Sequence, residues 1–103
     1  MNMMSGNANR INIIFKAATG VNYTLICNYG ITVNDMFREY FERIGRPNLF
    51  NDNNNKIEFI YNSKAINYLN NNTKIEEFFN RNTNSISIQV LTNDLIGAKK
   101  YMH

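Results

Sequence analysis

The sequence predicts an α+β domain in which a mixed sheet of four to five strands carries one main helix across one face and a short second helix. Three observations support this prediction. Residues 10–28 contain two runs that alternate apolar and polar side chains, the period of a strand with one buried face. Residues 33–44 have apolar side chains at steps of three and four, as in an amphipathic helix. Residues 85–91 return to strict alternation and predict a closing strand.

The length of 103 residues and the hydrophobic share of 44% are typical of one globular domain with a single core. We divide the chain into a leader at residues 1–9, a domain at residues 10–92 and a C-terminal tail at residues 93–103. The leader is polar and aperiodic, the tail has no periodicity, and no stretch approaches the length of a membrane span. We therefore expect a soluble protein that does not insert into a membrane.

The cysteine and histidine content argues against a stabilising disulfide or a metal. The chain has one cysteine, Cys27, and one histidine, His103, which cannot form an internal disulfide or a zinc site. This cysteine usage fits a reducing compartment, so we expect an intracellular protein, cytoplasmic or nuclear, without metal or cofactor. The net charge of +3 is mild, and basic residues are spread among acidic ones. On charge alone we therefore do not expect nucleic acid as a partner.

The first predicted element is a hairpin. Its two strands each place three apolar side chains on one face: Ile11, Ile13 and Phe15 in the first, and Tyr23, Leu25 and Cys27 in the second. Gly20 lies between the strands and can adopt a positive φ without steric cost. Residues 10–28 are thus expected to form two antiparallel strands.

The main helix is predicted to begin at Thr32, whose hydroxyl can accept a hydrogen bond from a free backbone N–H of the first turn. Asp35 adds a negative charge where the helix dipole favours one. Gly45 is expected to end the helix, and Pro47 prevents its return. The predicted inward stripe consists of Val33, Met36, Phe37, Tyr40, Phe41 and Ile44.

The second half of the chain predicts shorter elements. Residues 48–55 have the composition of a loop, residues 57–61 of a strand, and residues 65–66 of a stub of strand. Residues 73–76 have the spacing of a capping box and predict a short helix with Ile75 and Phe78 or Phe79 pointing inward. We expect the last strand to lie beside the first, with the main helix covering the inward face of the sheet.

Residues 13–45 resemble the opening of ubiquitin-like β-grasp domains. The segment FKAATG is similar to the first strand and turn of that family, and the spacing from Gly20 to Gly45 equals the family's spacing without a gap. The segment IEFIYNSKAI at residues 57–66 resembles the strand, turn and stub strand that follow the family's helix. The pattern covers about four fifths of the chain, and the loop at residues 46–55 is longer than the family usually carries.

The resemblance implies a docking surface. Ubiquitin-like domains bind partners through an exposed apolar patch on the open face of the sheet, and the matching positions are Ala18, Ile60, Ser87 and Gln89. Of these, Ile60 keeps the apolar character that the patch requires. By alternation Ile14 and Ile26 also point outward and extend the patch, with Tyr61 and Lys64 at its rim. The alternative interpretation is a set of scattered surface apolar residues without a function.

A second family feature is a C-terminal Gly-Gly that conjugating members expose for activation. This sequence has Asp94-Leu95 where the pair would lie, followed by Gly97. Some modifiers resemble this arrangement in ending on a single glycine after a tail is removed. The alternative function is therefore a ubiquitin-like modifier conjugated through Gly97, and the competing interpretation of this glycine is a plain turn.

Enzymatic functions have less support from the residues. Cys27 alternates into the core without a neighbouring base, which is typical of packing and not of a nucleophile. Glu76 and Glu77 are adjacent, so their side chains diverge on a helix, and nothing orients His103 for acid–base work. We expect a non-catalytic adaptor that binds other proteins and has no small-molecule substrate.

Binding of single-stranded nucleic acid is the remaining alternative. Such binding needs exposed aromatic side chains beside positive charge. Tyr29, Tyr61 and Tyr68, together with Lys99-Lys100 and Tyr101, are the residues from which such a platform would have to be built.

Overall fold

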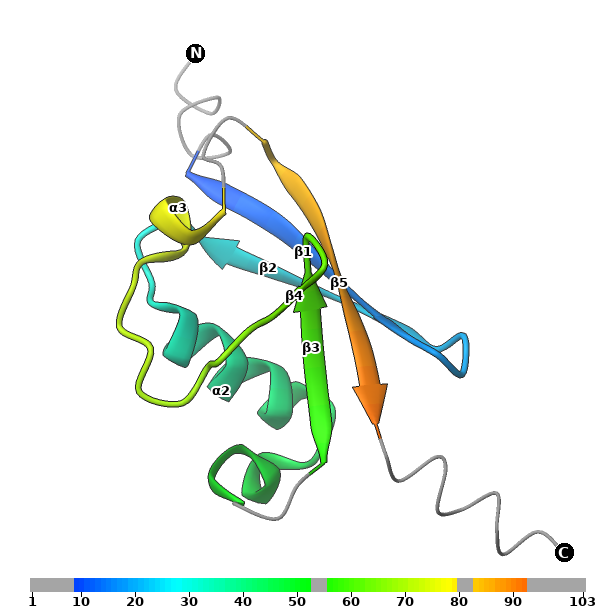
Figure 1. The fold of residues 1–103 in the computed structure, drawn as a ribbon. Coiled ribbons are helices and arrows are strands. Elements are labelled where there is room, and N and C mark those ends of the chain that lie inside the picture. The colour runs from blue at the N-terminus through cyan, green and yellow to red at the C-terminus, as the bar shows by residue number, and fades with distance from the viewer. Residues whose placement is uncertain (1–8, 53–55, 80–82, 93–103) are drawn as a thin grey trace, which may run out of the picture.

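The computed structural model describes residues 9–52, 56–79 and 83–92, whose centre is a five-stranded sheet in the order β2-β1-β5-β3-β4 (Figure 1). The strands are β1 (Arg10–Ala17), β2 (Asn22–Asn28), β3 (Ile57–Tyr61), β4 (Lys64–Ala65) and β5 (Ser85–Thr92). The helices are α2 (Val33–Arg43), the 3₁₀ helix η1 (Pro47–Asn51) and the short α3 (Ile75–Phe78). The predicted α+β class is confirmed.

The first and last strands form the centre of the sheet, as predicted. β1 pairs with β2 in antiparallel and with β5 in parallel orientation, and β3 pairs in antiparallel orientation with both β5 and β4. The turn between β1 and β2 is closed by a hydrogen bond of 2.9 Å, in which the N–H of Gly20 donates to the carbonyl of Ala17. Gly20 has φ +94°, a conformation in which a side chain would be strained.

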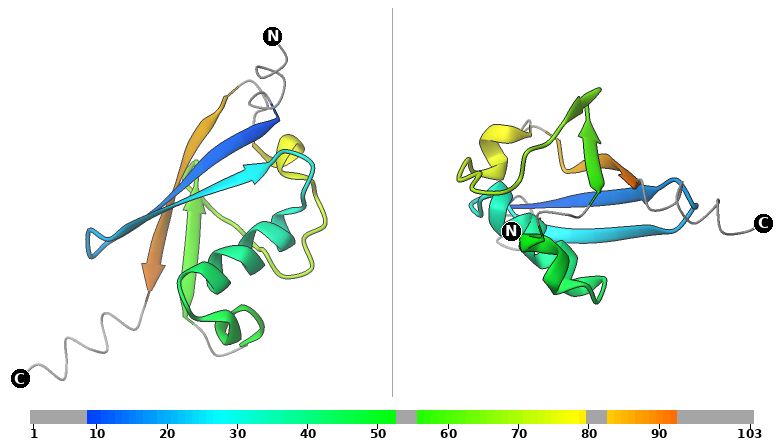
Figure 2. Two further views of the ribbon diagram at one scale, coloured as in Figure 1. Left: turned by 180° about the vertical axis from the view of Figure 1, so that it is seen from behind. Right: turned by 60° about the horizontal axis from the view of Figure 1, so that its bottom comes forward.

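The main helix α2 lies along one side of the curled sheet (Figure 2). The hydroxyl of Thr32 accepts a hydrogen bond of 3.1 Å from the N–H of Asp35, so the predicted N-cap is present. At the other end Gly45 has φ +81°, and its N–H donates to the carbonyl of Glu42 at 3.1 Å. Both predicted ends of the helix are confirmed to within one residue.

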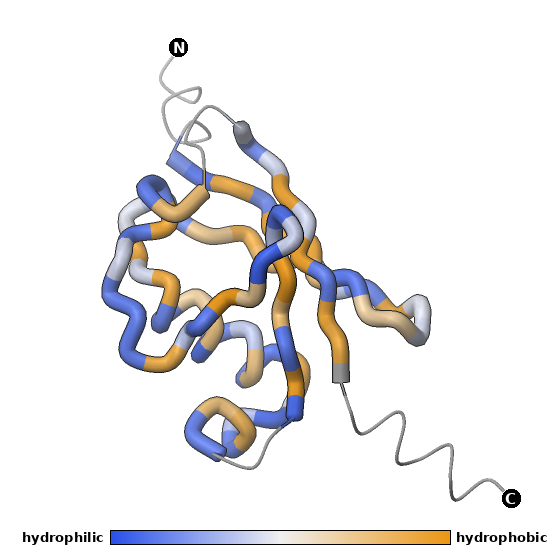
Figure 3. Tube along the Cα trace, in the orientation of Figure 1, coloured by the Kyte–Doolittle hydropathy of each residue, from blue (hydrophilic) through white to orange (hydrophobic). Residues whose placement is uncertain are grey.

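An aromatic cluster fills the space between α2 and the sheet. The ring of Phe59 lies at its centre and contacts five other aromatic rings, those of Phe15, Phe37, Tyr40, Phe41 and Tyr68. Among the described residues no polar or charged residue is buried. Apolar segments recur along the strands and along α2 (Figure 3). Burial of such side chains, at about 1.5–3 kcal/mol each, is the main stabilising contribution to this fold.

Ile44 does not belong to the core, contrary to the prediction. Its side chain is 37% exposed, whereas the other five residues of the predicted stripe are buried. The helix ends at Arg43, and Ile44 occupies the C-cap with φ −85° and ψ 3°. Because the backbone leaves the helical path at this residue, the periodicity that would have turned Ile44 inward no longer applies.

The predicted capping box of α3 does not form. Lys74 occupies the N-cap and makes no side-chain hydrogen bond to the helix. The free N–H groups of the first turn donate to a neighbouring segment instead: Ile75 to the carbonyl of Ile31 at 2.9 Å, and Glu76 to that of Tyr29 at 3.2 Å. Tertiary backbone contacts thus replace the local cap, while Ile75 is fully buried as predicted.

Two further boundaries differ from the prediction. The stub strand β4 covers Lys64–Ala65, one residue earlier than expected, because Asn62 and Ser63 complete the turn with φ values of 55° and 65°. The predicted loop at residues 48–55 contains most of the 3₁₀ helix η1, in which Phe50 is buried. The rest of that loop, residues 53–55, lies outside the described residues.

Candidate partner-binding surface

The sheet has a second face, which α2 and the other described helices leave uncovered. We call it the open face and define it as the even-numbered residues of β1, β2 and β3, the odd-numbered residues of β5, and Ala65 of β4. All of them are exposed or half-buried, whereas most of the residues that alternate with them belong to the core or pack against it. The strand period of two therefore separates a core-facing set from a solvent-facing set on the same strands.

The strand register brings four of the predicted binding residues together at the centre of the open face. Ile14 on β1 lies opposite Ser87 on β5. Gln89, two residues further along β5, lies opposite Ile60 on β3 and opposite Lys16 on β1. Neighbouring strands are about 4.8 Å apart, so these side chains form one continuous surface.

Leu91 is a member of this surface that the sequence interpretation missed. It lies opposite Glu58 and diagonal to Ile60, and its side chain is 41% exposed. Ala65 lies directly opposite Ile60 on its other side. Ile60 therefore has apolar neighbours on both flanking strands. The signal for Leu91 was present in the alternation, which places it with Ser87 and Gln89.

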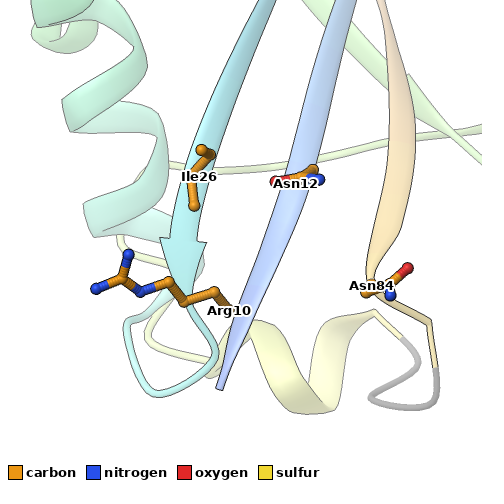
Figure 4. A pocket seen from close by; sticks show the side chains of 4 residues that line it. All are labelled: Arg10, Asn12, Ile26 and Asn84. Carbon is orange, nitrogen blue, oxygen red and sulfur yellow. The ribbon is translucent and has the colours of Figure 1, made fainter. Parts of the chain in front are cut away.

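Ile26 occupies the other end of the open face. It lies opposite Asn12 and diagonal to Ile14, and 61% of its side chain is exposed. Together with Arg10, Asn12 and Asn84 it lines a shallow recess of about 350 Å³ (Figure 4). Figure 4 shows the Arg10 side chain reaching past the end of β2. This recess combines an aliphatic side chain with amides and one cation.

Two predicted binding residues lie away from the centre of this surface. Ala18 is exposed in the turn beyond Ala17, the last residue of β1. Lys64 lies opposite Tyr61, and directly opposed residues share a face of the sheet. Lys64 therefore points to the side on which Tyr61 contacts the ring of Phe79, at a centroid distance of 4.8 Å, and not to the side of Ile60.

Comparison with known proteins identifies the same architecture in solved structures. No protein-family model matches this sequence, and no curated protein matches it. Solved structures similar to this chain include a ubiquitin, a UBL domain and a designed protein based on ubiquitin. The chain has the ubiquitin-like β-grasp fold.

Three neighbours illustrate the likeness. The UBL domain of Plasmodium falciparum Dsk2 is 17% identical with a TM-score of 0.56, covering 81% of this chain and 97% of that one. The ubiquitin of Caldiarchaeum subterraneum is 13% identical with a TM-score of 0.57, covering 81% and 92%. A designed protein based on ubiquitin is 18% identical with a TM-score of 0.55, covering 82% and 89%. The likeness extends over nearly the whole length of each neighbour.

The only cysteine in the sequence is buried in the core. Cys27 is 4% exposed, between the sheet and α2. Burial, the largest cause, and the charge of Glu39 together raise the pKa of its thiol to about 12, while the charge of Arg43 acts in the opposite direction. A thiol with this pKa is protonated at neutral pH and is a poor nucleophile.

We expect Cys27 to react with a thiol reagent such as DTNB only when the domain opens. At pH 8 the labelling rate should be at least about a hundredfold slower in the native than in the denatured protein, because access and thiolate formation are both suppressed. The rate should increase with sub-denaturing urea. Native labelling as fast as that of the denatured chain would show that the thiol is accessible.

Two of the aromatic residues proposed for nucleic-acid stacking are not available as a platform. Tyr29 and Tyr68 are buried, and the hydroxyl of Tyr29 donates to the carbonyl of Thr83. Tyr61 is half-buried against Phe79. The hypothesis is therefore wrong for Tyr29 and Tyr68, and Lys99, Lys100 and Tyr101 lie outside the described residues.

Of the other candidate chemical groups, only those on α3 lie within the described residues. Glu76 is half-buried and Glu77 exposed on α3, while Asp94, Leu95, Gly97 and His103 lie outside the described residues. Across residues 9–52, 56–79 and 83–92 no three His, Cys, Asp or Glu side chains cluster as metal ligands would. Among the described helices none is long and apolar enough to cross a membrane.

Proposed function

We propose that this ubiquitin-like domain is a non-catalytic docking module that binds other proteins through its open face. The observation that supports the proposal is the grouping of Ile60 with Leu91, Ala65 and, across Ser87 and Gln89, Ile14 on three adjacent strands and a stub. The polar side chains of Ser87 and Gln89 lie between Ile14 and Ile60. Such a mixture of exposed apolar and uncharged polar side chains is typical of the core of a transient interface.

The exposure of Leu91 and Ile26 strengthens this proposal. Four large apolar side chains are exposed in the described part of the chain: Val21, Ile26, Ile44 and Leu91. Two of them, Ile26 and Leu91, belong to the open face. Single exposed apolar residues need no explanation, but Leu91 adjoins Ile60 and Ile26 lies diagonal to Ile14, so both extend the apolar part of the open face.

The charges of the open face indicate the kind of partner surface. Arg10 and Lys16 on β1 are exposed cations of this face, and Glu58 on β3 is its exposed anion. A partner that places an aliphatic side chain near Ile60 and carboxylates near β1 complements this distribution. We propose such a partner in an intracellular setting, where the free thiol of Cys27 stays reduced.

The alternative function, conjugation through Gly97, concerns residues beyond Thr92. The likeness to an archaeal ubiquitin favours it as a second candidate, because the fold neighbours include a ubiquitin as well as a UBL domain. Under this alternative the protein from native cells would be joined covalently to other proteins after loss of residues 98–103. Under the docking proposal the chain keeps its full mass.

Replacing Ile60 by glutamate should weaken partner binding without unfolding the domain. Proteins retained by the immobilised full chain would be identified by mass spectrometry, purified and titrated against wild type and Ile60→Glu. We expect Kd to rise at least about 30-fold, equivalent to about 2 kcal/mol, because a charge would be desolvated at the centre of the interface. Circular dichroism should show an unchanged fold, since Ile60 faces away from the core.

The matched control adds the same charge elsewhere. Asn48 is exposed in η1, on the helix side of the domain, so Asn48→Glu should leave Kd unchanged. Equal Kd values for wild type and Ile60→Glu would place binding on another surface. Covalent adducts that end at Gly97, with no reversible binding, would support the modifier instead.

A further inference from the structure

The ubiquitin-like domain has a second apolar surface, on the helix side and away from the open face. It is a hollow of about 450 Å³ between the β1–β2 turn, the end of α2, η1 and the start of β3. The stacked rings of Phe15 and Tyr40, with centroids 4.0 Å apart, lie at its base. Its walls are formed by Val21, Tyr23, Ile44, Leu49 and Ile57. We call it the basal hollow.

The basal hollow contains the two exposed apolar side chains that the open face does not account for. Val21 is 72% exposed and Ile44 37% exposed, and they face the hollow from the hairpin side and the helix side. Leu49 and Ile57 are half-buried along the same walls. The exposure of Ile44 outside the core thus adds an aliphatic side chain to this hollow. The volume of the hollow lies in the range of roughly 300–1,000 Å³ found for small-ligand pockets.

One cation at the edge of the hollow lacks a partner among the described residues. Arg46 lines the hollow and is exposed, and no ion pair or side-chain hydrogen bond is found for its guanidinium within the described ranges. By contrast, the neighbouring Arg43 pairs with Glu39 at 2.6 Å. An occupant that suits the hollow therefore combines aliphatic side chains with a carboxylate.

The chain leaves its described part beside this hollow. Thr92, the last described residue, lies opposite Ile57, which belongs to the hollow's wall. The next eleven residues are NDLIGAKKYMH, in which Asp94 is followed directly by Leu95 and Ile96. At 3.3–3.6 Å per residue these two aliphatic residues can reach about 10–14 Å from Thr92.

The N-terminal leader is a poorer occupant. β1 and β5 are parallel, so the start of β1 lies at the opposite end of the sheet from Thr92 (Figure 1). Residues 1–8 also contain no acidic residue to approach Arg46. The tail has both the position and the chemistry that the hollow requires.

We propose that residues 94–96 of the C-terminal tail fold back into the basal hollow. Leu95 and Ile96 cover the aliphatic walls formed by Val21, Ile44 and Leu49, and the carboxylate of Asp94 approaches the guanidinium of Arg46. This contact is independent of the proposed docking function, because the hollow and the open face lie on opposite sides of the sheet. Removal of the tail from the hollow would therefore leave the open face intact.

The absence of tryptophan from the chain provides a direct test. In the full chain Leu95→Trp introduces one indole, whose fluorescence reports its surroundings. If residue 95 occupies the hollow, its emission lies at shorter wavelength than in the urea-unfolded chain, and acrylamide quenches it several-fold less efficiently. Adding Val21→Glu should restore the emission and quenching of an exposed indole.

Ile26→Glu is the matched control. Ile26 and Val21 are both exposed aliphatic residues of the same hairpin region, but Ile26 belongs to the open face. Ile26→Glu should leave the indole protected. Independently of tryptophan, the full-chain variant Leu95→Asp/Ile96→Asp should shift the NMR methyl resonances of Val21, Ile44 and Leu49 and leave those of Ile26 and Leu91 in place.

Three results with the tryptophan variant would overturn the proposal. The first is an indole at residue 95 that is as exposed in the folded as in the unfolded chain. The second is protection that persists in Val21→Glu, which would place the tail elsewhere. The third is protection that disappears on dilution, which would assign the hollow to the tail of a second copy. Unchanged methyl resonances in Leu95→Asp/Ile96→Asp would contradict the proposal without reference to the tryptophan variant.

Discussion

Phe59→Ala is expected to destabilise the domain by about 3–5 kcal/mol. Phe59 is 1% exposed, and its ring contacts those of Phe15, Phe37, Tyr40, Phe41 and Tyr68, so its removal leaves a cavity among rings that cannot all move inward. Domains of this size have unfolding free energies of roughly 5–15 kcal/mol. The variant should therefore lose much of its stability, and thermal unfolding should show a midpoint lower by roughly 12 °C or more.

The next residue along the same strand supplies the control. Ile60 points to the open face, so Ile60→Ala should change the free energy of unfolding by about 1 kcal/mol or less. Urea titrations of both variants would measure this contrast. Similar losses for Phe59→Ala and Ile60→Ala would contradict the assignment of the two faces of β3.

Ile88→Asp should abolish the folded state at neutral pH, with a loss of more than about 4 kcal/mol. Ile88 is fully buried opposite Phe15, and no described residue of the core is polar or charged. A carboxylate at this position has no partner, which is the costliest form of burial. Circular dichroism and NMR at pH 7 should show an unfolded chain.

The pH dependence of this variant has a defined sign. Burial raises the pKa of the new carboxyl in the folded state above its unfolded value of about 3.9. The protonated folded form is then favoured at low pH, so the deficit relative to wild type should shrink as the pH falls toward 4 and grow above it. Ser87→Asp, one residue away on the open face, should stay within about 0.5 kcal/mol of wild type at either pH. Equal stability of the two variants would contradict the assignment of Ile88 to the core and of Ser87 to the open face.

The sequence predicted those parts of the fold in which a local pattern and the tertiary structure agree. The alternation in residues 10–28 and 85–91 indicated strands with one buried face, and both faces were assigned correctly. The hydroxyl of Thr32 and the positive φ of Gly45 determine the ends of α2 through contacts within a few residues. Such features depend on near neighbours in the chain and can therefore be inferred from it.

The differences arose where distant segments decide the local outcome. The capping box at residues 73–76 was displaced because the carbonyls of Tyr29 and Ile31, far away in sequence, accept the free N–H groups of α3. Ile44 left the predicted stripe because α2 ends one residue before it. Helical periodicity does not locate the end of a helix to a single residue.

The sequence predicted which residues of the candidate site point outward, but not which of them are neighbours, because distant strands decide the latter. Alternation identified Ile14, Ile26, Ile60, Ser87 and Gln89 as outward residues, but only the register between strands shows which of them are neighbours. Lys64 was grouped with Ile60 from its position in the chain, whereas the pairing with Tyr61 turns it to the other side. The basal hollow has no sequence signature, since its walls come from the β1–β2 turn, α2, η1 and β3.

The parallel pairing of β1 with β5 also has a consequence for biosynthesis. Phe15 lies opposite Ile88, so the first and last described strands are neighbours in the sheet although the other described elements lie between them in the sequence. While the last strand is still inside the ribosome, the emerging chain can form its hairpin and α2 but cannot assemble the centre of the sheet. The central pairing of the sheet can therefore form only after β5 has emerged from the ribosome, and contacts of such long sequence separation favour slow, millisecond-scale or longer, refolding.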